Sequence, residues 1–218
     1  MMTLPEKATK IISLLKKQYP DAHCELNFSN PLELLIATIL SAQCTDKRVN
    51  GVTKALFKKY KKAADYARAP LPRFEQEIRS TGFYKNKAKA IQGCCRILDE
   101  KYGGQVPKEM EKLVQLPGIG RKTANVVLGH AYGTPGITTD THVIRVSQRL
   151  GLTKNKDPEK IEIDLQELIP QKHWTFVSDV LIFHGRRCCY ARSPNCPECP
   201  VLKLCSFEPK TLTVSRDR

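Results

Sequence analysis

Apolar side chains recur three and four positions apart along much of this 218-residue chain. That spacing is the period of an amphipathic helix, and no segment shows the convincing alternation of a strand. The expected class is therefore all-α, with enough chain for two modest hydrophobic cores. The stripes that predict helices are Ala8–Ile11–Ile12–Leu15, Val49–Val52–Leu56–Phe57, Ala88–Ile91–Cys95–Leu98, Ile161–Leu165–Leu168 and Val177–Val180–Leu181.

A further helix is predicted to begin after Asn30. Asn30, Pro31 and Glu33 fit its N-cap, first and third positions. The helix is apolar on nearly all sides, so we expect it at the centre of a domain. Its apolar run, Leu34 to Leu40, is too short to span a bilayer.

Two helices joined by a glycine-containing turn are predicted between residues 108 and 132. Pro117 and Gly118 should end the first helix, and the second should start near Arg121. The apolar faces are Met110–Leu113–Val114 in the first helix and Ala124–Val127–Leu128–Ala131 in the second. The pattern is that of a helix–hairpin–helix.

The turn of this hairpin could bind an anion. A helix begins with unpaired N–H groups and a positive dipole end, and glycines allow a phosphate to approach them. We expect Gly120 to take a backbone conformation closed to most other residues. An ordinary turn between helices is the alternative, but Arg121 and Lys122 directly after the turn favour phosphate binding.

A carboxylate follows the hairpin 18 residues after Lys122. Asp140 comes after the helix-breaking Gly133-Thr134-Pro135-Gly136 and precedes a helical stripe, so it also fits an N-cap. A lysine and a carboxylate together suit attack on a sugar carbon with stabilisation of the charge that develops there. Taken from the residues alone, Lys122 fits one more phosphate-binding cation better than a nucleophile.

Four of the nine cysteines lie near the C-terminus with the spacing C-x6-C-x2-C-x5-C: Cys189, Cys196, Cys199 and Cys205. A disulfide framework is typical of small secreted chains, which this sequence does not resemble. Four cysteine ligands serve zinc or an iron–sulfur cluster, and the spacing alone leaves both open.

The chain is strongly basic. Lys and Arg number 36 against 22 Asp and Glu, which gives a net charge of +14 and a pI of about 9.4. This charge favours nucleic acid as a partner but does not separate DNA from RNA or an anionic membrane. The N-terminus lacks a signal-peptide core, so we expect a soluble, cytoplasmic protein without export or transmembrane signals.

Three long motifs carry a resemblance to a known family. LPGIGRKTANVVL with TTDTHVIRV, HGRRCCYARSPNCPECPVLKLC and LIATILSAQCTDKRVN together resemble the endonuclease III family of base-excision DNA glycosylases. The similarity runs from about residue 5 to residue 205. It implies removal of oxidised pyrimidines from duplex DNA and cleavage at abasic sites through a lysine imine.

The resemblance gives the candidate residues their roles. Lys122 would attack the deoxyribose C1′, a step that needs a neutral amine and that we expect partial burial to favour. Asp140 would be the matching catalytic carboxylate. The pattern H-G-R-x-x-C from His184 selects Cys189 over Cys188 as the first ligand of a [4Fe–4S] cluster. The free thiols would then be Cys24, Cys44, Cys94, Cys95 and Cys188.

The resemblance also implies two lobes with a DNA cleft between them. Residues 24–134 would form a six-helix barrel ending in the hairpin, and residues 1–23 with 135–218 would form a discontinuous iron–sulfur domain. Lys122 and Asp140 would then face each other from different lobes. The DNA contacts would be Gln43, Phe83, Gly118, Gly120, Arg121, Thr123 and His142.

Two of those contacts concern nucleotide extrusion. Gln43 matches a family residue that fills the gap left by an extruded nucleotide. Phe83 stands where many relatives have a leucine wedge, and a buried anchor for its loop is the alternative. His142 is interpreted as structural or DNA-facing and not as the catalytic base.

Other functions of the same fold stay open. A thymine-mismatch or pyrimidine-dimer glycosylase is possible because lesion choice depends on pocket shape. A non-catalytic hairpin module would not need Lys122 and Asp140 together, and an adenine glycosylase would lack the hairpin lysine. We expect a monomeric, nucleoid-associated enzyme whose partner is double-stranded DNA with damaged bases or abasic sites.

Overall fold

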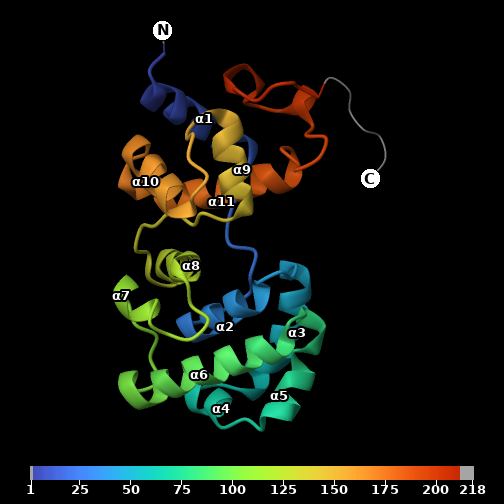
Figure 1. Ribbon diagram of the computed structural model, residues 1–218, viewed down its shortest axis with the longest axis vertical. Coiled ribbons are helices and arrows are strands. Elements are labelled where there is room, and N and C mark those ends of the chain that lie inside the picture. The colour runs from blue at the N-terminus through green and yellow to red at the C-terminus, as the bar shows by residue number, and fades with distance from the viewer. Residues whose placement is uncertain (1, 212–218) are drawn as a thin grey trace. The chain divides into compact units, whose positions relative to one another are not determined.

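The computed structural model describes residues 2–211, and every regular element in that range is a helix (Figure 1). The all-α prediction is therefore confirmed for this range. The chain divides into two compact units, Met1–Cys24 with Pro135–Arg218 and Glu25–Thr134. This division differs from the ranges expected from the sequence only in the unit that receives Cys24.

The unit Glu25–Thr134 is organised around α2 (Pro31–Ser41). Residues 34–40 are all buried, and α2 packs against α3, α6 and α8 (Figure 1). The side chain of Asn30 accepts a hydrogen bond from the Glu33 N–H at 3.0 Å, as the capping prediction requires. The other elements are α3 (Asp46–Lys59), α4 (Ala63–Ala67), α5 (Leu71–Glu77), η1 (Arg79–Thr81), α6 (Tyr84–Tyr102), α7 (Met110–Leu113) and α8 (Arg121–Tyr132).

The short helices α4 and α5 were not predicted from the sequence. Each is too short to show a helical period, and their fold depends on tertiary packing. Tyr60, Tyr66 and Phe74 form a buried aromatic cluster beneath them. Gln92 on α6 donates to the main-chain oxygens of Tyr66 and Ala69, which fixes the end of α4.

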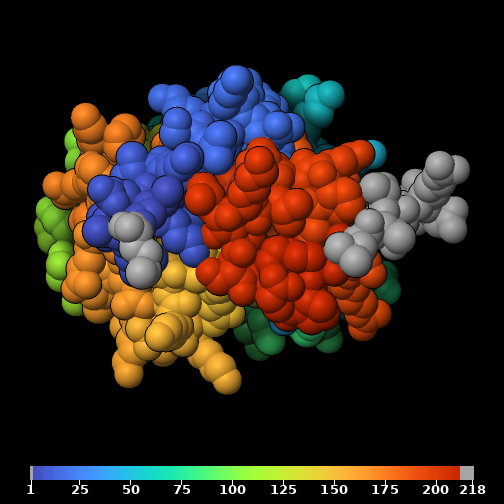
Figure 2. All heavy atoms as spheres, turned by 90° about the horizontal axis from the view of Figure 1, so that it is seen from above, coloured from blue at the N-terminus to red at the C-terminus, as the bar shows by residue number. Residues whose placement is uncertain are grey.

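The other unit combines the two ends of the described chain. Its helices are α1 (Leu4–Gln18), α9 (Thr141–Leu150), α10 (Pro158–Leu168) and α11 (Trp174–Arg187), with short turns η2 (Gln171–His173), η3 (Cys196–Glu198) and η4 (Leu202–Leu204). The predicted stripes of all four helices share one core. Figure 2 shows the N-terminal helix beside the C-terminal segment, where Lys7 Nζ donates to Ser206 Oγ at 2.9 Å.

None of the described helices combines the length and apolar character needed to cross a membrane.

Candidate active site and cysteine pocket

The hairpin turn between α7 and α8 depends on Gly118. Its φ is +77°, and a Cβ added there would lie 2.8 Å from the Cβ of Ala90. Leu116 and Ile119 on either side are buried and anchor the turn in the core. Positive φ and this close approach together exclude other residues, so the turn needs glycine at position 118.

Gly120 plays a different part from the one predicted. Its φ is −93° with ψ 174°, an extended conformation open to any residue, and nothing lies within 4 Å of an added Cβ. The expectation of a conformation restricted to glycine is therefore wrong. Gly120 is the N-cap of α8 and provides no side chain to cap it. The structure thus shows no side-chain cap on the first N–H groups of α8, and a helix start of this kind suits an anion.

The first helix of the hairpin is shorter than the sequence predicts. It covers Met110–Leu113 and not the full range 108–115. Leu113 is buried as expected, but Val114 is 41% exposed and does not join the apolar face. Pro117 and Gly118 follow only four and five residues after Leu113 and disfavour a longer helix. The chain therefore leaves the helix before Val114 can complete a second turn.

Lys122 lies in the first turn of α8, between Arg121 and Thr123. The predicted start of the helix at Arg121 is confirmed. The side chain of Lys122 is exposed in the structure, so the expected partial burial is wrong. Thr123 is half-buried, and Arg121 is exposed beside Lys122. The three residues therefore surround the open N-terminus of one helix.

Asp140 caps α9 in the other unit. Its Oδ1 accepts hydrogen bonds from the N–H groups of His142 and Val143, both at 2.8 Å. Its Oδ2 lies 3.0 Å from Nδ1 of His142, and only 11% of the Asp140 side chain is exposed. The N-cap prediction is confirmed. These contacts fix the orientation of the carboxylate, and the His142 ring serves this local structure.

Gly185 permits the close packing of α9 against α11 next to this cap. A Cβ at position 185 would lie 3.0 Å from the Cβ of His142 and 3.1 Å from Nη2 of Arg145. Arg145 uses the space to donate to the main-chain oxygens of Gly185 and Cys189, at 2.9 and 3.1 Å. The helix that Asp140 caps therefore also holds the start of the cysteine segment.

The cysteine segment, residues 188–205, follows α11. The four predicted ligands, Cys189, Cys196, Cys199 and Cys205, all line one pocket, and Cys188 lines it as well. Thiols gathered in this way suit a metal cluster, because thiolates are the ligands that zinc and iron–sulfur clusters share. The remaining cysteines, Cys24, Cys44, Cys94 and Cys95, do not line this pocket.

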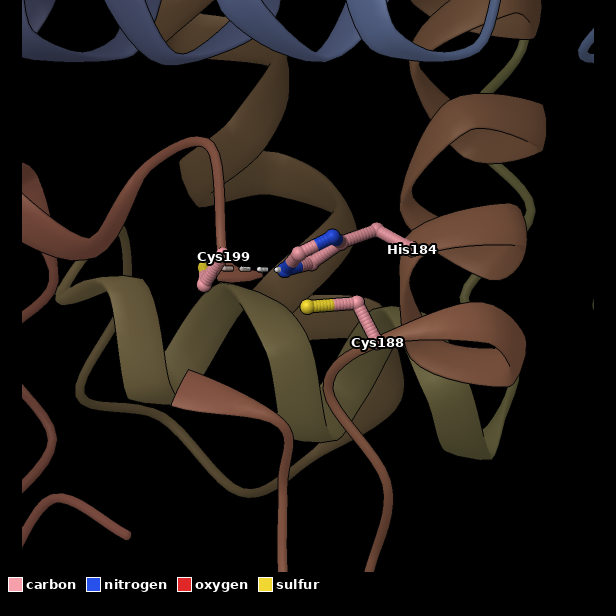
Figure 3. Close-up of side chains that lie close together, drawn as sticks. All are labelled: His184, Cys188 and Cys199. Atoms are coloured by element: carbon pink, nitrogen blue, oxygen red, sulfur yellow. Dashed lines mark hydrogen bonds between the residues drawn. The ribbon is translucent and has the colours of Figure 1, made fainter. Parts of the chain in front are cut away.

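His184, Cys188 and Cys199 form the tightest group in the pocket (Figure 3). Their potential ligand atoms lie within 4.8 Å of one another, and Cys199 Sγ is 3.7 Å from His184 Nε2. Hydrogen bonding with Cys188 lowers the pKa of Cys199 despite its burial, and His184 lowers it further. The same pairing raises the pKa of Cys188.

Two residues around the pocket were not assigned as site residues from the sequence. The Nδ1 of His184 lies 3.2 Å from the hydroxyl of Tyr19, which links the pocket to the end of α1. Arg149 on α9 donates to Cys189 Sγ at 3.4 Å and to the main-chain oxygens of Tyr190 and Ala191. His184 could have been found from its place in the HGR motif, whereas nothing in the sequence marks Arg149.

Gln43 and Phe83 stand on two exposed turns of the unit Glu25–Thr134. Gln43 lies between α2 and α3 with φ +52°, and Phe83 precedes α6 with φ +48°. Phe83 is 64% exposed, so the alternative of a buried loop anchor is wrong. Both side chains are therefore accessible, and both have backbone conformations that residues other than glycine rarely adopt.

Comparisons with known proteins identify the family. The model of the HhH-GPD superfamily base excision DNA repair proteins matches residues 36–171. Endonuclease III of a Synechocystis species is 54% identical over 206 residues, 94% of each chain. Endonuclease III of Bacillus subtilis is 52% identical over 188 residues, 86% of each chain.

A solved structure agrees with these relatives. The structure of a non-covalent endonuclease III–DNA complex matches with a TM-score of 0.90 and 49% identity, covering 94% of this chain and 96% of that one. The chain therefore belongs to the HhH-GPD superfamily of base excision DNA repair proteins and, within it, to the endonuclease III family.

Proposed function

We propose that this protein removes oxidised pyrimidines from duplex DNA and then cleaves the strand at the resulting abasic site. The observation that carries the proposal is Lys122, an exposed amine in the first turn of a helix whose N-cap, Gly120, leaves the N–H groups uncapped. An anion-binding helix end and a nucleophile are thus joined in one turn. Family membership gives this arrangement its substrate, a nucleotide in DNA.

The reaction starts with attack by the neutral Lys122 amine on C1′ of the damaged nucleotide. The C1′–N bond breaks, and the base leaves with the bonding electrons and takes up a proton. The sugar opens to an imine with Lys122. Loss of a C2′ proton then expels the 3′ phosphate by β-elimination, and hydrolysis releases the enzyme. These steps require no metal-activated water.

Asp140 stabilises the positive charge that grows on the sugar as the base departs. The hydrogen bonds from His142 and Val143 hold its carboxylate in one orientation, so little reorganisation is needed during the reaction. A carboxylate held in this way can also move protons during imine formation. Lys122 and Asp140 belong to different compact units, and the proposed reaction uses both.

DNA binding rests on charge and on the hairpin. The net charge of +14 attracts the phosphate backbone, and counterion release should make the affinity fall steeply with salt. Gly118, Gly120, Arg121 and Thr123 surround the proposed phosphate site at the N-terminus of α8, and His142 lies beside Asp140. Gln43 fills the gap left by the extruded nucleotide, and Phe83 inserts as a wedge.

Cys189, Cys196, Cys199 and Cys205 are proposed to hold a [4Fe–4S] cluster. All four line one pocket. When bound, the cluster supplies a covalent cross-link between the ends of the cysteine segment. The chain's own part is to present the four sulfurs and to contact DNA through the organised segment.

The two units correspond to the two lobes of this proposal. The unit Glu25–Thr134, which contains the seven α-helices α2 to α8, is proposed as the barrel lobe that ends in the hairpin, and the discontinuous unit is proposed as the iron–sulfur domain. The enzyme acts as a monomer on damaged or abasic duplex DNA, and its working place is the nucleoid.

A panel of duplexes, each with one defined lesion, tests the proposed function. We expect base release and strand cleavage with oxidised pyrimidines and with abasic sites, in EDTA and without magnesium. Undamaged duplex and duplex with a single uracil are the controls. Activity confined to thymine mismatches or to pyrimidine dimers would replace the proposed substrate, and binding without base release would point to a non-catalytic hairpin module.

A further inference from the structure

Lys87, on α6, is a buried lysine outside the proposed reaction centre. It is only 5% exposed, and burial lowers the pKa of its ammonium group. Its Nζ donates to two main-chain oxygens, those of Leu40 and Thr81, both at 2.8 Å. Burying an ammonium is costly unless its donors are satisfied, so these two carbonyls explain how the position accommodates a lysine.

The first carbonyl belongs to the segment that presents Gln43. Leu40 lies in the last turn of α2, whose carbonyls lack intrahelical partners and which has no basic residue of its own. Lys87 provides both a donor and a positive charge at that helix end. Gln43 follows three residues later with φ +52°. The ammonium therefore secures the end of the helix from which this strained turn starts.

The second carbonyl belongs to the segment that presents Phe83. Thr81 ends η1, and the chain then passes through Gly82 with φ +70° to Phe83 with φ +48°. The main-chain N–H of Lys87 also donates to the oxygen of Phe83 at 3.1 Å. Backbone conformations of this kind persist only where the surrounding structure holds them. Lys87 thus binds this turn from both its side chain and its main chain.

We propose that Lys87 is a positioning residue for nucleotide extrusion. Its single ammonium group joins the Gln43 turn to the Phe83 turn and sets the spacing between them. The two side chains then enter the duplex as one rigid pair, so one residue fills the gap while the other separates the neighbouring bases. This inference rests on the roles proposed above for Gln43 and Phe83.

The first test compares Lys87→Met with Lys89→Met. Methionine keeps the length of the side chain but cannot donate, and Lys89 is an exposed lysine on the same helix. Under single-turnover conditions, Lys87→Met should slow excision of an oxidised pyrimidine from duplex by about tenfold or more, as misplaced binding groups do. Cleavage of a single-stranded abasic site, which needs no extrusion, should stay within about twofold. Lys89→Met should match the wild type on both substrates.

The second test separates positioning from a general structural role. Lys87→Met is introduced into a Gln43→Ala/Phe83→Ala background, and duplex excision is measured again. A positioning residue has nothing left to position there, so the added change should have no further effect. Equal slowing in both backgrounds, or equal slowing on duplex and single strand, would overturn the inference.

Two further variants separate the possible reasons for a negative result. The Gln43→Ala/Phe83→Ala variant is also measured alone. If it excises the base at the wild-type rate, the proposed roles of Gln43 and Phe83 are wrong. That result is distinct from failure of the Lys87 inference. If Lys87→Met does not fold, Lys87→Gln enters the same cycle, since glutamine retains two N–H donors without the charge. Additive slowing by Lys87→Gln would overturn the inference in the same way.

Discussion

The hairpin around Gly118 and the cysteine segment 188–205 hold their proposed functional groups by different means. The hairpin is fixed by backbone geometry and by buried apolar neighbours, Leu116 and Ile119. The cysteine segment has only short 3₁₀ turns, and two side chains of α9, Arg145 and Arg149, hold its main chain. Within this segment, Val201 is the apolar side chain that is fully buried.

This difference indicates where each region is vulnerable. The hairpin owes its shape to the chain itself, so changes to Lys122 should remove chemistry and leave the structure intact. The cysteine segment depends on polar contacts and on the groups that its thiols bind, so changes there should affect folding before they affect chemistry.

The largest effect should come from Lys122→Gln. We expect strand cleavage at an abasic site to fall by about 10³-fold or more, because the imine cannot form. Affinity for the same duplex should change little, since the phosphate contacts come mainly from main-chain N–H groups. Single-turnover rates measure strand cleavage, and anisotropy measures the affinity for the duplex. Lys112→Gln, a change at another exposed lysine, is the control. Strong loss of affinity in Lys122→Gln would make the residue a phosphate ligand and not the nucleophile.

Cys199→Ser should give the opposite result in the cysteine segment. We expect the variant to lose most of its iron and sulfide. Its free energy of unfolding should fall by more than about 3 kcal/mol. Iron analysis and thermal melting provide the readouts. Cys24→Ser, a half-buried thiol outside the pocket, is the control. A Cys199→Ser protein with wild-type melting and affinity would remove the contrast between the two regions.

Asp140→Asn should slow base release by on the order of 10²-fold through loss of negative charge in the transition state. Asparagine is as good an N-cap as aspartate, so the stability of α9 should hold. Asp140→Ala loses the cap as well and should also lower the free energy of unfolding, by about 1 kcal/mol. Equal base-release rates for Asp140→Asn and the wild type would exclude an electrostatic role.

The two glycines of the hairpin should respond in opposite directions. Gly118→Ala should lower the free energy of unfolding by about 1–3 kcal/mol, because of its positive φ and its approach to Ala90. Gly120→Ser should keep or raise stability, since serine can cap α8, yet it should weaken DNA binding by about tenfold because its hydroxyl occupies the N–H groups. Chemical denaturation and salt-matched affinity measurements test the pair. Tight DNA binding by Gly120→Ser would disprove the phosphate site.

Sequence patterns were sufficient for the features that depend on local rules. The apolar run of α2, the caps at Asn30 and Asp140 and the start of α8 at Arg121 all follow from helical period and capping preferences. The grouping of the four cysteines in one pocket agrees with their spacing.

Features that depend on tertiary contacts could not be predicted in this way. Glycine is needed at position 118 and not at 120, because Gly118 has a positive φ and Ala90, on another helix, lies against it. The exposure of Lys122 and the hydrogen bonds of Lys87 likewise depend on which elements pack together. Spacing along the chain contains no information about such neighbours.

The most direct test of the account is to identify the residue that becomes bonded to DNA. The protein is incubated with an abasic duplex and borohydride, which reduces an imine to a stable amine, and the adduct is mapped by peptide mass spectrometry. We predict one adduct, at Lys122, and none with Lys122→Gln. An adduct at another lysine, or undiminished trapping by Lys122→Gln, would contradict the proposed mechanism.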